Sequence, residues 1–261
     1  MSIYDRMMNI DRRIIYTLLA FIVFFTVLKP LGLPVKITPE TQAFYDSIES
    51  LPEGAVIWLD TAYGPGTIGE LNPMVIGVLH QAFRNKLKVI VTSMWEQGPQ
   101  IAQDLIEQVA AQYDVEYGVD YVHLGYRPGG AAVVLQRLQE SIEEAMAGVD
   151  HLGNSLADLL LMKEVPRLTK EYVDYIVVFE TGSPGAGTYL TYVTEKQGIP
   201  LSVGIIAMSV PDAKPFLDSG QYTAIIPGAR GAAEYELLLG IPGKAVASQD
   251  AISAAALFAY C

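Results

Sequence analysis

The sequence has a single cysteine and no excess of basic residues. Because that cysteine, Cys261, is the last residue, no disulfide bond can form within the chain. Lys and Arg number 17 against 29 Asp and Glu, which gives a formal net charge of −12. Binding to nucleic acid requires a basic surface that neutralises phosphates. We therefore expect no nucleic-acid partner.

Several signatures of enzymes, metals and cofactors are also missing. The sequence contains no G-x-S-x-G nucleophile elbow and no Walker A motif. Its histidines, His80, His123 and His151, lack the spacing of metal ligands on one helix, and a lone terminal cysteine cannot contribute to a Cys/His zinc set. We expect no metal and no cofactor. A non-catalytic role is favoured, although these absences leave the question of enzymatic activity open.

Residues 64–69 match the dinucleotide-binding pattern G-x-G-x-x-G, but their context does not fit. In that fingerprint a strand runs directly into the first glycine and a helix begins within the motif. Here residues 60–63 intervene, and the predicted helix begins only at Asn72-Pro73. The next strand ends in Thr92-Ser93 where an acidic residue is needed. The pattern is therefore disfavoured as a dinucleotide site.

An uncharged apolar run over residues 14–28 follows Arg12-Arg13 and ends at Lys29. Fifteen residues of helix cover about 22 Å of a hydrocarbon core about 30 Å thick, and residues 31–34 extend the run. The sequence predicts a transmembrane signal-anchor over 14–34, with 1–13 as a short cytoplasmic tail by the positive-inside rule. A cleaved signal peptide and a buried helix are alternatives. The exit lacks the small residues of a cleavage site.

This orientation makes the chain a single-pass membrane protein that contacts lipid through its N-terminal helix. The rest of the chain is then periplasmic or extracellular. Thr38-Pro39-Glu40 indicates the start of a linker helix within residues 35–50. The apolar end, residues 248–261, is expected to form a helix that packs on the domain or associates with the membrane. The alternative is the first half of a second span.

Residues 51–247 alternate between strand-like and helical patterns, which indicates one α/β domain. Short apolar runs without clean alternation are typical of strands that are buried on both faces. We expect a doubly wound, mostly parallel, Rossmann-like sheet of about six strands with helices on both faces. Two halves, 51–147 and 171–247, would be joined by 148–170, either as an insertion packed elsewhere or as an interaction arm. The predicted strands are 55–59, 88–92, 121–126, 175–179, 201–208 and 223–226.

Helices are expected between these strands and after the last one. Two predicted helices begin at Asn72-Pro73 and Gly98-Pro99, and a short one begins at Val210. The others cover residues 131–146, 155–163, 183–197 and 231–239.

Ligands of open α/β sheets bind beyond the carboxyl ends of the strands, and the sequence places several candidate residues there. Ser183 is predicted to cap a helix whose first turn is nearly free of side chains, so that Gly182, Ser183 and Gly185 form an anion site. Arg127 and Arg230 lie on equivalent loops, where each binds a small anionic ligand or forms a surface ion pair.

Weak catalytic candidates lie at the same edge. Asp60 and Glu180 follow two predicted strands and suit acid/base work if those strands are neighbours, and Ser183 is a third candidate.

Taken together, the sequence favours an anchored extracytoplasmic domain that acts as a non-catalytic binding or scaffold subunit. Tyrosine is abundant, at 15 of 261 residues, and is favoured at protein interfaces. We therefore expect homo- or hetero-oligomeric protein partners in a membrane-associated assembly. The alternative is an anchored hydrolase or transferase that acts on a small polar or anionic substrate at the strand ends. A ligand sensor is a third reading, with little room for a cytoplasmic output module before the anchor.

Overall fold

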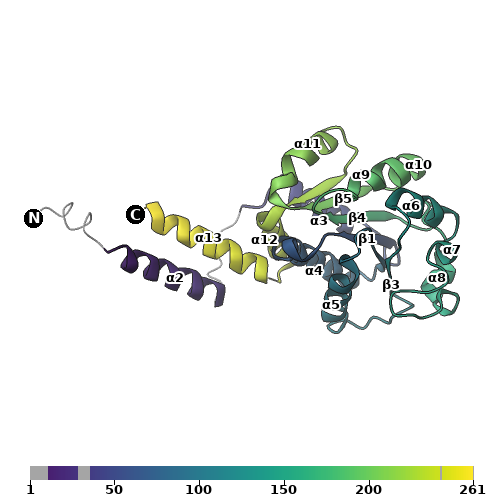
Figure 1. Ribbon diagram of the computed structural model, residues 1–261, viewed down its shortest axis with the longest axis horizontal. Coiled ribbons are helices and arrows are strands. Elements are labelled where there is room, and N and C mark those ends of the chain that lie inside the picture. Colours follow the sequence, from purple (N-terminus) through teal and green to yellow (C-terminus); the bar gives the residue numbers. More distant parts are fainter. Residues whose placement is uncertain (1–10, 29–35, 242, 261) are drawn as a thin grey trace, which may run out of the picture.

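The computed structural model describes residues 11–28, 36–241 and 243–260 (Figure 1). The predicted cytoplasmic tail and the end of the predicted anchor, residues 29–34, therefore lie largely outside the described residues. Within them the chain forms an α/β fold with one parallel sheet of six strands in the order β3-β2-β1-β4-β5-β6. The strands are β1 (Val56–Ala62), β2 (Lys88–Ser93), β3 (Tyr121–Tyr126), β4 (Tyr175–Glu180), β5 (Leu201–Ile205) and β6 (Ala224–Pro227).

All six predicted strands are present, and the sheet is buried on both faces. Side chains of β1 alternate between two hydrophobic cores: Ile57 and Leu59 face one, whereas Trp58 and Ala62 face the other. The predicted strand over 201–208 is too long, because β5 ends at Ile205 and residues 207–209 form a 3-10 turn. Three strands precede residues 148–170 and three follow them, as predicted.

Helices cover both faces of the sheet (Figure 1). The helices of the domain are α3 (Pro39–Glu49), α4 (Ile68–Arg84), α5 (Gly98–Ala110), α6 (Ala131–Glu140), α7 (Ile142–Ala145), α8 (Leu160–Glu164), α9 (Ala186–Tyr189), α10 (Glu195–Gln197), α11 (Val210–Asp218) and α12 (Gly228–Leu239). Between α9 and α10 lies a π-helical turn, η3 (Leu190–Thr194).

Two helices begin earlier in the chain than predicted. Helix α4 begins at Ile68 rather than at Asn72-Pro73, and it contains Pro73. Pro73 cannot donate a hydrogen bond to the carbonyl of Gly69, but Gly69 lies in the exposed first turn of the helix. The last helix of the sheet, α12, begins at Gly228 instead of Gly231, directly after β6.

The predicted helix over 131–146 is interrupted at Ser141. This residue is extended (φ −160°, ψ 121°), and its hydroxyl accepts a hydrogen bond from the amide of Glu144, so it ends α6 and caps α7. The segment 148–170 that follows is partly buried against the domain. Its side chains Leu156, Leu161 and Leu168 are buried in the same core as Trp58.

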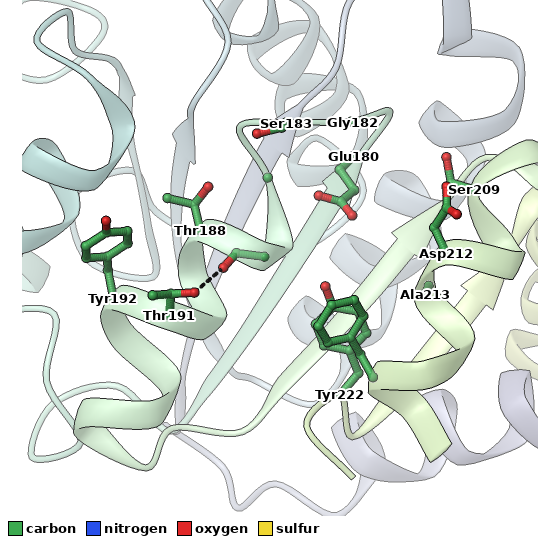
Figure 2. Close-up of a pocket in the computed structure, with 13 residues that line it drawn as sticks. Glu180, Gly182, Ser183, Thr188, Thr191, Tyr192, Ser209, Asp212, Ala213 and Tyr222 are labelled. Atoms are coloured by element: carbon green, nitrogen blue, oxygen red, sulfur yellow. Dashed lines mark hydrogen bonds between the residues drawn. The ribbon is translucent and has the colours of Figure 1, made fainter. Parts of the chain in front are cut away.

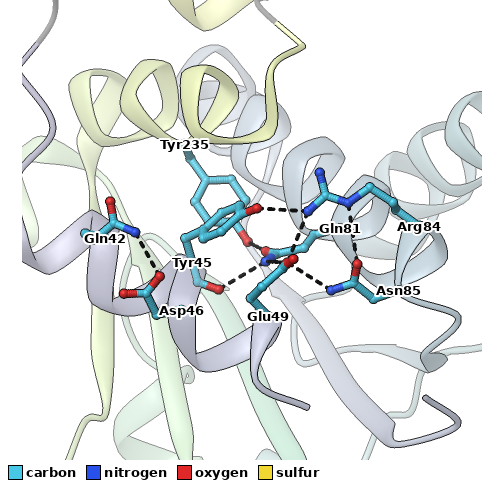
Figure 3. Close-up of polar contacts among 8 residues, drawn as sticks. All are labelled: Gln42, Tyr45, Asp46, Glu49, Gln81, Arg84, Asn85 and Tyr235. Carbon is cyan, nitrogen blue, oxygen red and sulfur yellow. Dashed lines mark hydrogen bonds and ion pairs between the residues drawn. The ribbon is translucent and has the colours of Figure 1, made fainter. Parts of the chain in front are cut away.

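Three helices meet at a polar junction on the other face of the sheet (Figure 3). Tyr235 of α12 donates a hydrogen bond to the Oε1 of Gln81 in α4. The side-chain amide of Gln81 donates to Glu49 of α3 at 2.8 Å, and Arg84 also contacts that carboxylate, at 3.1 Å. A buried amide and hydroxyl are thereby satisfied, which fixes how α3, α4 and α12 pack.

Two apolar helices project together from the domain (Figure 1). Helix α2 (Arg12–Leu28) lies along α13 (Lys244–Tyr260), and α13 also packs on α12 at the edge of the domain. Within the described part of the chain, none of the helices combines the length and apolar character needed to traverse a membrane.

Candidate functional site

Strands β1 and β4 lie at the centre of the sheet, where the chain reverses its winding. From β1 the chain continues to β2 and β3 on one side, and from β4 to β5 and β6 on the other. The loops that leave these two strands diverge, and the crevice between them is the usual ligand site of such sheets. Asp60 and Glu180 were expected to converge if their strands are neighbours. That condition is met, because β1 and β4 are paired.

Asp60 and Glu180 lie on the same face of the sheet. Asp60 is in register with Val178, and Ala62 with Glu180, so the two carboxylates are two positions apart on adjacent strands. Burial raises the pKa of Glu180, and the nearby charge of Asp60 raises it further. They nevertheless line different hollows, since the segment from Pro184 to Tyr189 lies between them.

Asp60 is completely buried and has three hydrogen-bond donors. Thr92 Oγ1 lies 2.8 Å and Tyr189 OH 2.9 Å from its Oδ2, and the amide of Met94 lies 3.2 Å from its Oδ1. Tyr189 in turn accepts a hydrogen bond from the indole of Trp58 at 2.8 Å. Burial raises the pKa of Asp60 to about 6, although the three donors oppose the shift.

Asp60 lines a hollow of about 240 Å³ that has a mostly apolar wall from α6, including Val134, Leu135 and Leu138. Arg127, predicted from the sequence as a ligand-binding residue, lines the same hollow. Arg127 is half-buried and forms no ion pair with any described residue. An apolar hollow with a carboxyl group and an unpaired cation is a typical small-molecule site.

A second and larger hollow, of about 460 Å³, lies on the other side of the Pro184–Tyr189 segment (Figure 2). Glu180 enters it from the end of β4, Thr188 and Thr191 from the following helix, and Asp212 from α11. Gly182, Ser183 and Gly185, predicted as an anion site, belong to its lining.

The predicted cap is wrong in one respect, because the helix begins at Ala186 and its N-cap is Gly185 rather than Ser183. The amide of Ala186 donates a hydrogen bond to the Oε2 of Glu180. Gly185 permits this contact, since a Cβ atom there would lie 1.8 Å from that oxygen. A carboxylate of the protein itself therefore occupies one of the amides that the predicted anion site would offer.

Arg230 lies apart from both hollows. Within α12 it forms an ion pair with Glu234 at 2.9 Å and donates to the carbonyl of Lys36 at 3.3 Å. Glu234 is fully buried and also accepts hydrogen bonds from the amide and hydroxyl of Thr38. These contacts hold the segment before α3 against α12. The structure thus does not bring Arg230 and Arg127 together.

The sequence did not predict several residues that line the two hollows, among them Tyr189, Asp212 and Tyr222. Tyr189 and Tyr222 look like ordinary core tyrosines in their local patterns. Asp212 follows Pro211 in the first turn of α11, where an acidic residue is common for helix stability alone.

Among the described residues, no group of three or more His, Cys, Asp or Glu side chains is arranged to hold a metal ion. Neither a comparison with models of known protein families nor a search of curated protein sequences finds a match for this chain.

Proposed function

We propose that this chain is a membrane-anchored α/β domain that acts by binding, as a non-catalytic subunit of an oligomeric membrane assembly. One observation carries the anchor: the exposed face of α2. Ile14, Tyr16, Phe21 and Phe24 are each between 58% and 65% exposed. Contiguous apolar surface of this kind marks contact with lipid or with another protein.

Helix α2 by itself is shorter than a typical hydrocarbon core, so the proposed insertion depends on local thinning of the bilayer. Its 17 residues cover about 26 Å, some 4 Å less than a typical hydrocarbon core. Local thinning of the bilayer accommodates such a mismatch at a fraction of a kcal/mol per Å. Withdrawing each large apolar side chain from water gains about 1.5–3 kcal/mol, so the gain exceeds the cost. Arg12 and Arg13 before the apolar run favour a cytoplasmic N-terminus, with the domain periplasmic or extracellular.

Binding is favoured over catalysis because both candidate carboxylates already serve the fold. Asp60 accepts three hydrogen bonds from the protein, and Glu180 binds the first amide of α9. The abundance of tyrosine, with 15 residues, suits protein interfaces.

Membrane fractionation and native mass measurement test this proposal. The full chain is expected in the membrane fraction after high-salt washing, and after gentle detergent extraction in a complex heavier than its 28.4 kDa. The double variant Phe21→Arg/Phe24→Arg should release the protein, because arginine within the apolar core of a bilayer costs about 2.5–3.5 kcal/mol per residue. Met208→Arg, at a side chain that is 84% exposed on the domain, is the matched control. Wild-type protein that is soluble, or a lone monomer after extraction, would contradict the proposal.

A second candidate is an anchored hydrolase or transferase that acts on a small anionic substrate. The observation that favours it is the hollow that contains both Asp60 and Arg127. A carboxyl group with a pKa of about 6 is suited to exchange a proton near neutral pH, and an unpaired guanidinium binds carboxylate or phosphate through two hydrogen bonds.

This alternative is tested with a panel of phosphate and carboxylic esters, using the extracted full chain. Asp60→Asn should abolish turnover, whereas Arg127→Gln should mainly raise KM. Arg230→Gln is the control, because Arg230 lines neither hollow. Turnover that survives Asp60→Asn would exclude the assignment.

A further inference from the structure

We infer that the larger hollow, between β4, the α9 helix and α11, binds a neutral, hydroxyl-rich small molecule of the sugar or polyol class. This inference is independent of the membrane anchor and of the assembly proposed above. It also differs from the anionic ligand that the sequence predicted for this part of the chain.

The charge of the lining argues against an anion. Glu180 and Asp212 both contribute carboxylates, and no Lys, Arg or His among the described residues lines the hollow. The Oε1 of Glu180 receives no hydrogen bond from the described part of the protein, although Oε2 is bound by Ala186. One carboxylate oxygen is therefore free to accept a hydrogen bond from a ligand.

Hydroxyl groups dominate the rest of the polar lining (Figure 2). Thr191 uses its hydroxyl to bind the carbonyl of Gly187 at 3.0 Å. The remaining hydroxyls of the lining make no hydrogen bond with a described residue; they belong to Ser183, Thr188, Tyr192, Ser209 and Tyr222. A hydroxyl both donates and accepts, which complements a ligand whose own groups do the same. An ammonium ligand only donates, so it would leave much of this capacity unused.

The lining also includes a pair of aromatic rings. The rings of Phe216 and Tyr222 stack with centroids 5.1 Å apart and planes inclined by 28°. Burial and the charge of Glu180 both raise the pKa of Tyr222, so its hydroxyl stays protonated as a donor next to the carboxylate. The volume, about 460 Å³, lies within the range of small-molecule sites, roughly 300–1,000 Å³. Carboxylate, hydroxyls and aromatic side chains together match a sugar ring, which is polar at its rim and apolar on its faces.

The test is isothermal titration calorimetry of the full chain in a detergent without sugar head groups. Neutral monosaccharides and inositol are titrated at millimolar concentration alongside inorganic phosphate, citrate and putrescine. At least one neutral compound should bind, and more tightly than the charged ones. Tighter binding of phosphate, citrate or putrescine would overturn the ligand class. No heat from any neutral compound would overturn the site.

Two variants locate the binding. Gly187→Trp should abolish it, because Gly187 lines the hollow and an added Cβ atom there meets no atom within 4 Å. Gly69→Trp is the matched control, since Gly69 is also a helical glycine with open space around it and does not line the hollow. Glu180→Gln should weaken binding by about tenfold while its amide oxygen retains the contact with Ala186. Unchanged binding in Gly187→Trp would place the ligand elsewhere.

Discussion

The hydroxyl of Tyr189 lies 2.9 Å from the Oδ2 of Asp60, although the two residues are 129 positions apart in the sequence. Asp60 lies near the end of the first strand, β1, and Tyr189 lies on the helix after β4. Their hydrogen bond therefore ties the two halves of the sheet together at the point where the winding reverses. This hydrogen bond is buried, and Tyr189 is also bonded to Trp58 and Thr92. Substitution of Asp60 or Tyr189 should therefore change the free energy of unfolding measurably.

Asp60→Asn should remove a pH-dependent loss of stability. The carboxyl group titrates near 3.8 in the unfolded chain, and burial raises its pKa to about 6 in the folded protein. The folded state thus holds this proton more tightly, so wild-type protein loses stability as the pH rises from about 4 to about 6 and regains none of it above that range. The difference of about two pKa units corresponds to about 3 kcal/mol. Urea unfolding across this pH range should show the stability of Asp60→Asn rising by this amount relative to that of the wild-type protein.

The asparagine also changes the hydrogen bonds to Thr92 and Tyr189, but that effect does not depend on pH. Parallel pH profiles for the two proteins would mean that Asp60 is not protonated on folding.

Tyr189→Phe should lower the free energy of unfolding by about 1–3 kcal/mol, because it leaves the indole N–H of Trp58 without its acceptor and removes a donor from Asp60. The lost donor should also raise the pKa of Asp60, which moves the pH-dependent window upward. Tyr192→Phe is the control: it lies three residues further along the same helical segment, and its hydroxyl binds no described residue. Equal unfolding free energies for the two variants would contradict this role of Tyr189.

The sheet was predictable because its strands are short apolar runs bounded by glycine, proline and polar residues. The strand Tyr121–Tyr126 was predicted at its observed limits, and the other strands differ mainly at their ends. The ends of the helices were less predictable, because a proline indicated a helix start and a serine was not recognised as a helix end. Pro73 lies inside α4, and Ser141 divides a stretch whose apolar spacing suits one continuous helix. Both outcomes depend on tertiary packing, which the local pattern does not contain.

The candidate site was predictable to the extent that it lies on strand ends. Asp60 and Glu180 lie near the carboxyl ends of β1 and β4, and Arg127 directly follows β3. Parallel strands place their carboxyl ends along one edge of the sheet. Tyr189 and Tyr222 reach the hollows from helices or loops whose docking is set by packing. Arg230, in contrast, was predicted on an equivalent loop but lies in the first turn of α12, where it pairs with the buried Glu234. Sequence spacing alone does not distinguish that contact from an exposed ion pair.

His123→Gln should make the protein less sensitive to acid. His123 is buried, with Nδ1 2.9 Å from the Oε1 of Gln103, and burial lowers its pKa to about 3. The ring of His151, 4.5 Å away, lowers the pKa further, whereas Asp150 raises it. Below pH 6.5, His123 is therefore protonated in the unfolded chain but stays neutral in the folded protein. The free energy of unfolding falls by up to about 1.4 kcal/mol per pH unit on acidification.

This effect has the opposite sign to that of Asp60, so the measurement is best made in the Asp60→Asn background. Urea unfolding of that protein with and without His123→Gln should give profiles that diverge below about pH 6.5. Profiles with the same acid slope would assign the sensitivity to other groups.

Gly77→Ala and Gly69→Ala, both in α4, should change stability in opposite directions. A Cβ atom at Gly77 would lie 2.7 Å from the Cδ1 of Tyr235, whereas one at Gly69 meets no atom within 4 Å. Tyr235 is fully buried and its hydroxyl binds Gln81, so the ring cannot tilt away without losing that hydrogen bond (Figure 3). We expect Gly77→Ala to destabilise the protein by about 1–3 kcal/mol through overpacking.

Gly69→Ala should stabilise the protein by about 0.5–1 kcal/mol, because alanine loses less backbone entropy than glycine when a helix forms. Chemical unfolding of both variants at neutral pH measures the two changes under one condition. The helix propensity gain is common to both, so the difference between them isolates the contact with Tyr235. A Gly77→Ala variant as stable as Gly69→Ala would show that α12 can move away from α4, and that the polar junction of Gln81, Glu49 and Arg84 does not hold the helices at their observed separation.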